Sequence, residues 1–446
     1  MADLGGSAAQ NTPSRRDFLK RSTAMAAGAT LAGGLTVARS AHAAGSDLVR
    51  IALIGAGGRG TGAAVEALNN KSYPNVKLVA VADAFQNRAQ NSLGQITRRC
   101  KDKVDVPAER VFVGLDCHEK AIACGCDMVL LCGPPGFRPQ QFEAAVKAGK
   151  HVFMEKPVCT DGPGYRRIVA ANAEAKKKNL LVAVGHHLRH EDKHREVIKR
   201  IHDGLIGRVM YMLAYFNSTG VWSFARQPNE PELQYQVRNW YYYTWLSGDH
   251  IVEQHVHDLD VCNWMMKDQH PVEANGMGGR EVRKGPQYGE IFDHHAVEFT
   301  YADGTRMFSQ CRHIPGTWQS FSEHAYGTKG CANIEGHGDS QICVTGEKPL
   351  RWKRTADGHQ IEHDDLFAAL AAGKPYNEGD HGADASMTAV LGRMATYSGK
   401  VVKWDEAVKS ELDLSPKTFA WNADTPVKPL ADGTYACAVP GVTKAW

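Results

Sequence analysis

A glycine-rich turn near the start of the chain has the spacing of a phosphate-binding loop. The apolar residues 51–54 run directly into Gly55-Ala56-Gly57-Gly58-Arg59-Gly60, which has the spacing G-x-G-x-x-G. Glycine permits a tight turn and a close approach of the backbone to a pyrophosphate, and the N-terminus of a following helix attracts phosphate charge. The turn therefore predicts a dinucleotide site. A glycine-rich turn in another kind of α/β domain is the alternative interpretation.

A carboxylate after this turn indicates which dinucleotide would bind. Asp83 ends the next apolar segment, residues 78–83, where it can accept hydrogen bonds from ribose hydroxyl groups. Its charge would repel a 2′-phosphate, so we expect NAD, with NADP as the alternative because Arg88 lies nearby. The expected cofactor-binding residues of this region are Gly55, Gly57, Gly58, Arg59, Gly60, Asp83 and Arg88.

A second group of residues is suited to proton transfer or to metal binding. Glu253 and His257 are four residues apart, so on a helix they share a face, and the carboxylate can orient or charge the imidazole. His257 can act as a base or an acid near neutral pH. A metal bound by His250, Glu253, His255 and His257 is disfavoured, because positions 255 and 257 face different sides of a helix. Residues 190–194 match the zinc-protease pattern H-E-x-x-H without an obvious protease context, and we expect no metal.

The elements that must position these residues form two patterns. From residue 48 to about 184, short apolar runs alternate with helical stretches, which predicts a parallel sheet covered on both faces. After residue 185, strand-like stretches, a hairpin signal at 302–304 and one inserted helix predict a largely antiparallel sheet. The expected parts are an α/β dinucleotide-binding domain (44–184), an α+β substrate and oligomerisation domain (185–400), and a tail (401–446) that wraps the surface.

Several motifs resemble the Gfo/Idh/MocA family, which includes glucose–fructose oxidoreductase and inositol dehydrogenase. The resemblance covers most of the chain from about residue 49 to 400. Arg138 stands where the family often has histidine. The matching motifs are Gly133-Pro134-Pro135 in place of the family's Thr-Pro-Asn cofactor loop, Glu155-Lys156-Pro157 for its E-K-P signature, Gly185-His186-His187-Leu188-Arg189 at the start of the second domain, and Glu253, His257 and Asp260 for its D-x-x-x-H-x-x-D element, with Glu replacing the first Asp.

The resemblance implies a Rossmann domain followed by an open-faced sheet domain, with the substrate between them and Lys156 and His257 near the nicotinamide. Oxidation of an alcohol removes the hydroxyl proton as hydride leaves the carbon. Lys156 is the candidate to hold that hydroxyl, because burial and a positive nicotinamide would lower its pKa. The aromatic residues 240–245 are suited to stacking on sugar rings, although core packing is the alternative. We expect Lys156, His257 and Glu253 to be catalytic, Gly133, Pro134, Pro135, Glu155 and Lys156 to bind the cofactor, and His187, Arg189, Trp240, Tyr243, His250 and Asp260 to bind the substrate.

The first residues of the chain predict export. Ser14-Arg15-Arg16-Asp17-Phe18-Leu19-Lys20 precedes a weakly apolar stretch and then Ala41-His42-Ala43, a pattern similar to a twin-arginine signal peptide over residues 1–43. We therefore expect a periplasmic protein that is exported folded. The eleven cysteines include no C-x-x-C pair and are expected to be small core residues rather than disulfides.

The composition excludes some partners. The net charge of +3 gives no electrostatic argument for nucleic acid, and no run of about 18 strongly apolar residues predicts membrane insertion. An open sheet usually buries one face against another subunit, so a homo-oligomer, a dimer or a tetramer, is expected.

Export also bears on the reaction, because the periplasm is expected to hold little free NAD. An enzyme there would keep its cofactor bound and return it to the starting redox state. Paired oxidation and reduction of two sugars achieves this. The sequence therefore predicts an NAD(P)-dependent carbohydrate or polyol oxidoreductase. The alternative is a redox-neutral glycoside-cleaving enzyme that uses oxidation, elimination, hydration and reduction, and a non-catalytic sugar- or dinucleotide-binding protein is the third class.

Overall fold

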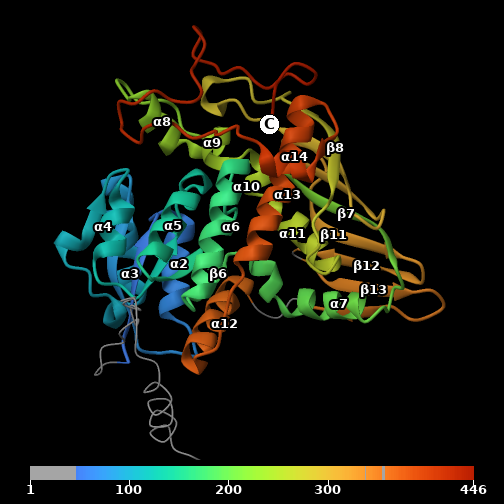
Figure 1. Ribbon diagram of the computed structural model, residues 1–446, viewed down its shortest axis with the longest axis horizontal. Helices are drawn as coiled ribbons and strands as arrows, with labels where there is room; N and C mark the ends of the chain where they lie inside the picture. Colours follow the sequence, from blue (N-terminus) through green and yellow to red (C-terminus); the bar gives the residue numbers. More distant parts are fainter. Residues whose placement is uncertain (1–46, 337, 354–356) are drawn as a thin grey trace, which may run out of the picture. The chain divides into compact units, whose positions relative to one another are not determined.

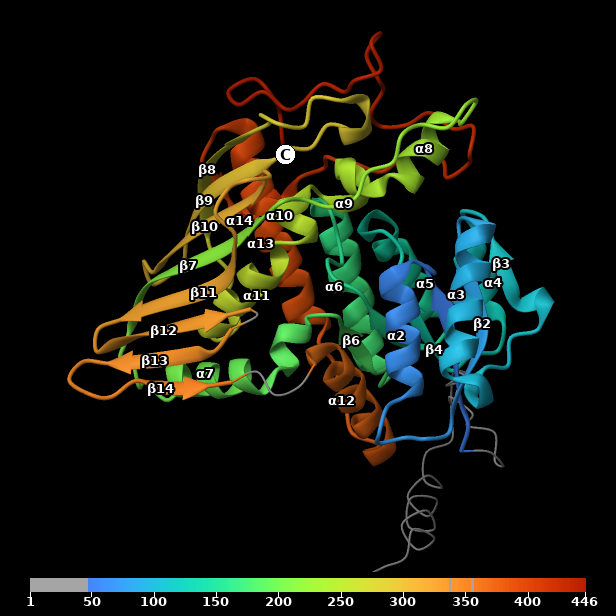
Figure 2. The same cartoon turned by 180° about the vertical axis from the view of Figure 1, so that it is seen from behind.

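The computed structural model describes residues 47–336, 338–353 and 357–446. The expected signal peptide, residues 1–43, lies outside the described residues, so export stays a prediction. Residues Asp47–Trp446 form one unit that contains two sheets, each with its own helices (Figures 1 and 2).

The first sheet has six parallel strands in the order β3-β2-β1-β4-β5-β6. All four residues of β4 are buried, as expected for a central strand that helices cover on both faces. The strands are β1 (Val49–Ile54), β2 (Val76–Asp83), β3 (Val111–Val113), β4 (Met128–Leu131), β5 (His151–Met154) and β6 (Val182–Val184). The helices are α2 (Gly58–Leu68), α3 (Gln86–Arg99), α4 (Cys117–Ala123), α5 (Arg138–Lys147) and α6 (Gly162–Lys177), with 3-10 turns η1 (Lys101–Lys103), η2 (Ala108–Arg110) and η3 (Pro135–Phe137).

The strand order reverses between β1 and β4, so the turns that follow these strands are neighbours at the carboxyl edge of the sheet. A Cβ atom built on Gly55 would lie only 2.2 Å from the backbone nitrogen of Gly133. Open α/β sheets bind ligands at such a reversal. The topology therefore joins the glycine-rich turn and the 133–135 loop into one site.

The second sheet has nine strands in the order β14-β13-β12-β11-β7-β10-β9-β8-β15, and only the β7–β10 pair is parallel. Buried and exposed residues alternate along β10, so one face of the sheet packs inward. The predicted fold class, a Rossmann domain followed by a mostly antiparallel sheet domain, is confirmed. The strands are β7 (Val209–Ser218), β8 (Glu273–Gly279), β9 (His294–Thr300), β10 (Arg306–His313), β11 (Ser320–Gly327), β12 (Gly330–Glu335), β13 (Ser340–Val344), β14 (Leu350–Trp352) and β15 (Val402–Lys403).

Two long helices connect the two sheets. α13 (Gly379–Ser398) packs against β8 and also against α6, and in both views it lies between the sheets (Figures 1 and 2). α12 (Gly358–Ala372) packs against α2, and its Leu366 and Phe367 join the core of the first domain. The remaining helices are α7 (Asp192–His202), α8 (Glu232–Arg238), α9 (Thr244–Ser247), α10 (His250–Glu253), α11 (Val256–Met265) and α14 (Trp404–Lys409), with 3-10 turns η4 (His187–His190), η5 (Trp240–Tyr242) and η6 (Pro286–Tyr288).

Residues 410–446 contain no helix or strand. They are tied to the rest of the unit at several points. The backbone N–H of Leu414 donates to Asp161, and Tyr435 is buried beside Tyr243. Among the described residues, no helix is long and apolar enough to span a bilayer.

Candidate active site

A groove of about 460 Å³ lies over the glycine-rich turn and the start of α2. A Cβ atom on Gly60 would come within 1.9 Å of the Gly55 carbonyl oxygen, so the turn closes only with glycine at this position. Gly57 and Gly58, in contrast, have no atom within 4 Å of a built Cβ atom. The residues therefore fit a dinucleotide diphosphate above the helix N-terminus, where backbone N–H groups are free to donate.

Asp83 lies on the wall of this groove, where the sequence placed it. Its carboxylate accepts hydrogen bonds from the backbone N–H groups of Ala56 (2.7 Å) and Phe85 (2.9 Å). Burial is the largest influence on Asp83 and raises its pKa, against the lowering effect of these N–H groups and of Arg88. Arg88 also lines the groove, and its guanidinium donates to the carbonyl of Arg238 in the second domain (3.2 Å).

A second cavity, of about 730 Å³, brings the expected catalytic residues together. Lys156 follows β5 in the first domain, and its Nζ donates to the backbone oxygen (2.5 Å) and to Oε1 (3.0 Å) of Glu253 at the end of α10. Both side chains are largely buried. His257, in the first turn of α11, lines the same cavity. Lys156 and His257, which come from different domains, therefore line one cavity.

His257 is held in its neutral form. Burial lowers its pKa well below the usual value, and the charge of Lys156 and the ring of His187 lower it further. Its Nδ1 atom has no hydrogen-bond partner among the described residues. The ring centroid of His187, a residue we expected at the substrate, lies 4.7 Å away. A neutral imidazole nitrogen without a hydrogen-bond partner can accept a hydrogen bond from a hydroxyl group.

The groove and the cavity share walls. Arg59, Cys132, Gly133 and Trp240 line both of them. A ligand that extends along the groove therefore reaches the cavity that contains Lys156. This arrangement is the one a dinucleotide requires, with its diphosphate over α2 and its reactive ring beside the substrate.

Two arginines of the site form hydrogen bonds or ion pairs with other groups of the protein. Arg138 is buried and donates to the carbonyls of Leu131 (2.7 Å) and Gly133 (2.9 Å), which fixes the 133–135 loop. Arg59 pairs with Glu155 (3.0 Å) and with Glu66. The expected cofactor residues Arg59 and Glu155 therefore lie at the site and neutralise each other.

Four of the six expected substrate residues lie outside the cavity lining. Tyr243 is buried in an aromatic cluster with α8 and α9. Arg189 and Asp260 form a buried ion pair (2.7 Å) between η4 and α11, and His250 binds Asp249. Each of these four side chains is used in packing or pairing, and its assignment to the substrate stays a prediction.

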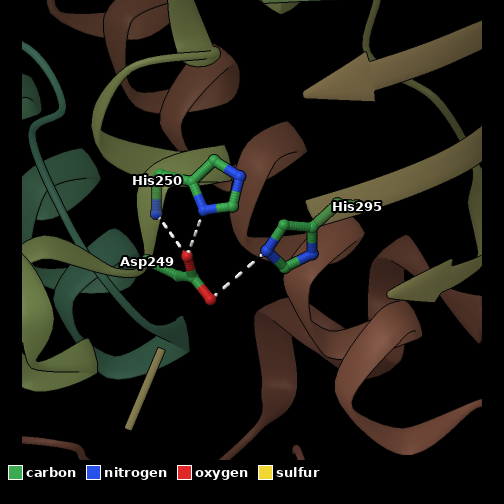
Figure 3. Close-up of side chains that lie close together, drawn as sticks. All are labelled: Asp249, His250 and His295. Carbon is green, nitrogen blue, oxygen red and sulfur yellow. Dashed lines mark hydrogen bonds and ion pairs between the residues drawn. The ribbon is translucent and has the colours of Figure 1, made fainter. Parts of the chain in front are cut away.

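The cluster of Asp249, His250 and His295 holds the start of α10, the helix that ends with Glu253. Asp249 has a φ of +76°, and its carboxylate accepts from the backbone N–H and Nδ1 of His250, while His295 Nε2 lies 3.2 Å from Oδ2 of the carboxylate (Figure 3). It also accepts from the Tyr397 hydroxyl (2.6 Å) and from the backbone N–H of Phe292 (3.0 Å). Four hydrogen bonds occupy the roughly four lone-pair positions of the carboxylate, so the cluster is better described as a structural anchor of α10 than as a metal site.

The residues of the other two metal interpretations have separate partners. His255 binds Ser309 (2.7 Å), while Glu253 pairs with Lys156. His190 of the H-E-x-x-H segment binds Asp365 (2.8 Å). None of these groups directs its ligand atoms at a common point.

Buried histidines predict how stability depends on pH. Burial lowers the pKa of His186 and His250 to about 4 and that of His255 to about 3, below the unfolded value of about 6.5. Below that value the unfolded chain binds protons that the folded chain does not, so this stability is fully present above about pH 6.5 and is lost as the pH falls toward 4. We expect the Tm to fall across this window, and a constant Tm would contradict the prediction.

Sequence reasoning missed several polar residues of the cavity. Asn217 and Ser218 end β7, Gln319 and Ser320 lie where β11 begins, and Gln254 follows Glu253. The two strands are neighbours only because the sheet pairs them, more than a hundred positions apart in the chain. Gln254 alone had a local signal, its position beside an expected catalytic residue.

Comparison with known proteins supports the assignment of the groove as a dinucleotide site. Residues 49–186 match the Gfo/Idh/MocA profile, an oxidoreductase family with an NAD-binding Rossmann fold. This segment therefore resembles the NAD-binding domain of that family. The inositol 2-dehydrogenase of Rhizobium meliloti is 26% identical over 336 residues, which are 73% of this chain and 89% of that enzyme. The myo-inositol 2-dehydrogenase of Thermotoga maritima is 26% identical over 50% of this chain and 56% of that enzyme.

Solved structures share the fold of this oxidoreductase along most of its length. Aldose–aldose oxidoreductase from Caulobacter crescentus, complexed with glycerol, has a TM-score of 0.62 at 18% identity and covers 80% of this chain and 99% of its own. Levoglucosan dehydrogenase, in complex with NADH and levoglucosan, has a TM-score of 0.62 at 16% identity with the same coverage. At these identities the likeness shows the shared architecture.

Proposed function

We propose that this oxidoreductase transfers a hydride between a nicotinamide dinucleotide and a hydroxyl-bearing carbon of a carbohydrate or polyol. The observation that carries the proposal is the meeting of Lys156, Glu253 and His257 in the cavity into which the dinucleotide groove opens. When bound, NAD supplies the hydride acceptor. Everything else in the reaction is positioning and proton transfer by the protein.

The side chains divide the proton chemistry between them. Lys156 Nζ has three donors, and Glu253 engages it through two acceptor atoms, so a donor is left for a substrate hydroxyl. His257 is neutral and is positioned to take the hydroxyl proton, and in the reverse direction it returns the proton to the carbonyl oxygen. Glu253 keeps the ammonium in place and balances its charge.

The lining of the cavity favours an uncharged substrate. Among its described residues, Lys156 is paired with Glu253, Arg59 with two glutamates, and Arg138 donates to backbone carbonyls. The buried Asn217 Nδ2 has no hydrogen-bond partner among the described residues. A free amide donor suits a hydroxyl group, whereas a phosphate or carboxylate would find no unengaged cation. The polyol and sugar names of the relatives agree with this substrate class.

The test uses purified protein and a panel of neutral aldoses, inositols and their acid or phosphate derivatives. Bound or added NAD should become reduced with the neutral compounds and not with the anionic ones. Reduction by the anionic compounds alone would refute the substrate class. Absence of reduction with every compound would refute the reaction.

The redox-neutral glycoside-cleaving enzyme remains the second candidate, because the same residues could serve a transient oxidation. Incubation with aryl glycosides separates the two. Release of phenol without net NADH absorbance would establish cleavage, and NADH formation without phenol would establish net oxidation.

We also propose that the protein acts in the periplasm after folded export and as a homo-oligomer. All eleven cysteines are free, which suits folding in a reducing compartment. Phe308 and Met277 are exposed on the second sheet, which suits burial against another subunit. Cell fractionation with Arg15 and Arg16 replaced by lysine tests the first statement, and light scattering of the mature protein tests the second.

Cofactor choice gives a prediction at Asp83. Replacement of Asp83 by serine should lower catalytic efficiency with NAD by about tenfold to a hundredfold, the equivalent of one or two charge-assisted hydrogen bonds. Efficiency with NADP should rise, because the repulsion of a 2′-phosphate is removed and Arg88 remains. The exposed Asp102 provides the control, and Asp102→Ser should change neither value. Equal efficiencies before and after the Asp83 change would exclude a ribose contact.

A further inference from the structure

The segment between β7 and α8, residues 219–231, has no helix or strand but exposes two large aromatic rings. Trp222 is 43% exposed and Phe224 is 38% exposed, and their ring centroids are 5.0 Å apart. We call this segment the aromatic loop. Two adjacent exposed rings are a costly surface for a soluble protein unless a ligand or partner covers them.

The rings of the aromatic loop face the dinucleotide groove. Trp222 and Phe224 line the groove together with residues 55–61 and Asp83 of the first domain. Trp240 extends the same wall, with its ring centroid 5.9 Å from that of Trp222. The groove therefore has the glycine-rich turn on one side and an aromatic wall from the second domain on the other.

The aromatic loop is held by side chains of residues 235–242. The Phe224 backbone N–H donates to Asn239 (3.0 Å), and its carbonyl accepts from the Tyr235 hydroxyl (3.0 Å). The Val221 carbonyl accepts from the Tyr242 hydroxyl (3.1 Å). Both tyrosines are buried. Irregular backbone with this many side-chain anchors is a fixed wall rather than a free loop.

Hydrogen bonds also connect the aromatic loop to the end of the groove that contains Asp83. Arg88, beside Asp83, donates to the carbonyl of Arg238, and Arg238 in turn donates to the carbonyl of Ala225 in the aromatic loop (2.8 Å). The first domain, the groove wall and the loop are thus joined by hydrogen bonds at one end of the groove. Opening the groove there requires these bonds to break.

We propose that the aromatic loop is a cofactor-retaining wall, in which Trp222 and Phe224 cover the bound dinucleotide and slow its release. The inference rests on the proposed function, because it takes the groove to hold NAD. Aromatic rings against a nucleotide add apolar contact without sequence-specific hydrogen bonds. Covering by the second domain means that the cofactor leaves only when the loop or the domain moves. A retained cofactor is what an enzyme needs where free NAD is scarce.

The test measures cofactor release from the full-length folded protein. Wild type and Trp222→Ala/Phe224→Ala are loaded with NADH and passed over a desalting column, and the remaining dinucleotide per subunit is followed with time. We expect release from the double variant to be at least tenfold faster. Leu430→Ala removes an exposed apolar side chain outside the groove and should leave release unchanged.

A second variant separates the rings from their anchors. Tyr235→Phe/Tyr242→Phe keeps every ring and removes only two hydroxyl groups that hold the loop. Its release should also be faster than that of wild type, by less than the ring deletions. If the double alanine variant does not fold, release from this tyrosine variant still tests the inference.

The outcomes distinguish the inference from the proposed function. If wild type binds neither NAD nor NADH, both are overturned. If wild type binds the dinucleotide and all variants release it at the wild-type rate, the retaining wall is overturned and the proposed function stands. If the ring deletions raise KM for the sugar without changing release, the rings belong to the substrate and the inference is wrong.

Discussion

Replacement of Lys156 by methionine is expected to lower kcat by about a thousandfold while the dinucleotide stays bound. Positioned proton-transfer groups contribute about 10² to 10⁴ in rate. In the proposed reaction Lys156 holds the substrate hydroxyl, and its charge lowers the pKa of His257. Methionine fills nearly the same volume, so the cavity should keep its shape. Stopped-flow or steady-state turnover measures kcat, and mass spectrometry of the denatured protein measures bound NAD.

Lys147, an exposed residue in the last turn of α5, provides the matched control. Lys147→Met should leave kcat and bound NAD unchanged. Wild-type turnover in Lys156→Met would remove Lys156 from the mechanism. Loss of NAD together with turnover would instead make Lys156 a cofactor-binding residue.

Removal of the Asp249 charge should produce the largest loss of stability. Asp249→Asn is expected to lower the free energy of unfolding by about 3–5 kcal/mol, because an amide keeps only one acceptor oxygen for the four buried hydrogen bonds that the carboxylate accepts. Burial by itself would raise the pKa of Asp249, but His295 and His250 outweigh burial and hold it well below the usual value. Chemical denaturation measures the change.

The exposed Asp424 allows a control with the same chemical change. Asp424→Asn should alter the free energy of unfolding by less than about 0.5 kcal/mol. A loss below about 1 kcal/mol in Asp249→Asn would show that the cluster does not depend on the charge. In that case the placement of α10, and with it Glu253, must rest on packing alone.

The sequence predicted structure correctly where a motif depends only on its local backbone geometry. The turn at residues 55–60 closes because Gly60 has no Cβ atom to meet the Gly55 oxygen, and that requirement is local. Asp83 ends a strand next to that turn in the sheet, so its position followed from the strand order of a Rossmann domain. The motif containing Lys156 was likewise short and continuous.

The same reasoning did not predict the internal contacts of side chains whose neighbours come from distant segments. Arg189 and Asp260 were expected at the substrate because they belong to motifs that resemble the family's, and in the structure they pair with each other. Tyr243 looked like a sugar platform, and it packs instead with Tyr435 from the tail. The amino-acid sequence does not show which polar or aromatic side chains will form ion pairs or pack in the core of the folded protein.

The amino-acid sequence by itself determined the dinucleotide turn and the order of the two sheets, because short-range backbone geometry and the hydrophobic pattern encode them. The roles of Lys156, Glu253 and His257 stay predictions, and Glu253 and His257 lie on two successive short helices, α10 and α11, rather than on the one helix that their spacing predicted. Only the tertiary structure decided which residues of the second domain line the groove. It placed Trp222 and Phe224 opposite the glycine-rich turn and Asn217 in the cavity. The reason is that these contacts join segments whose meeting depends on the packing of whole sheets and helices.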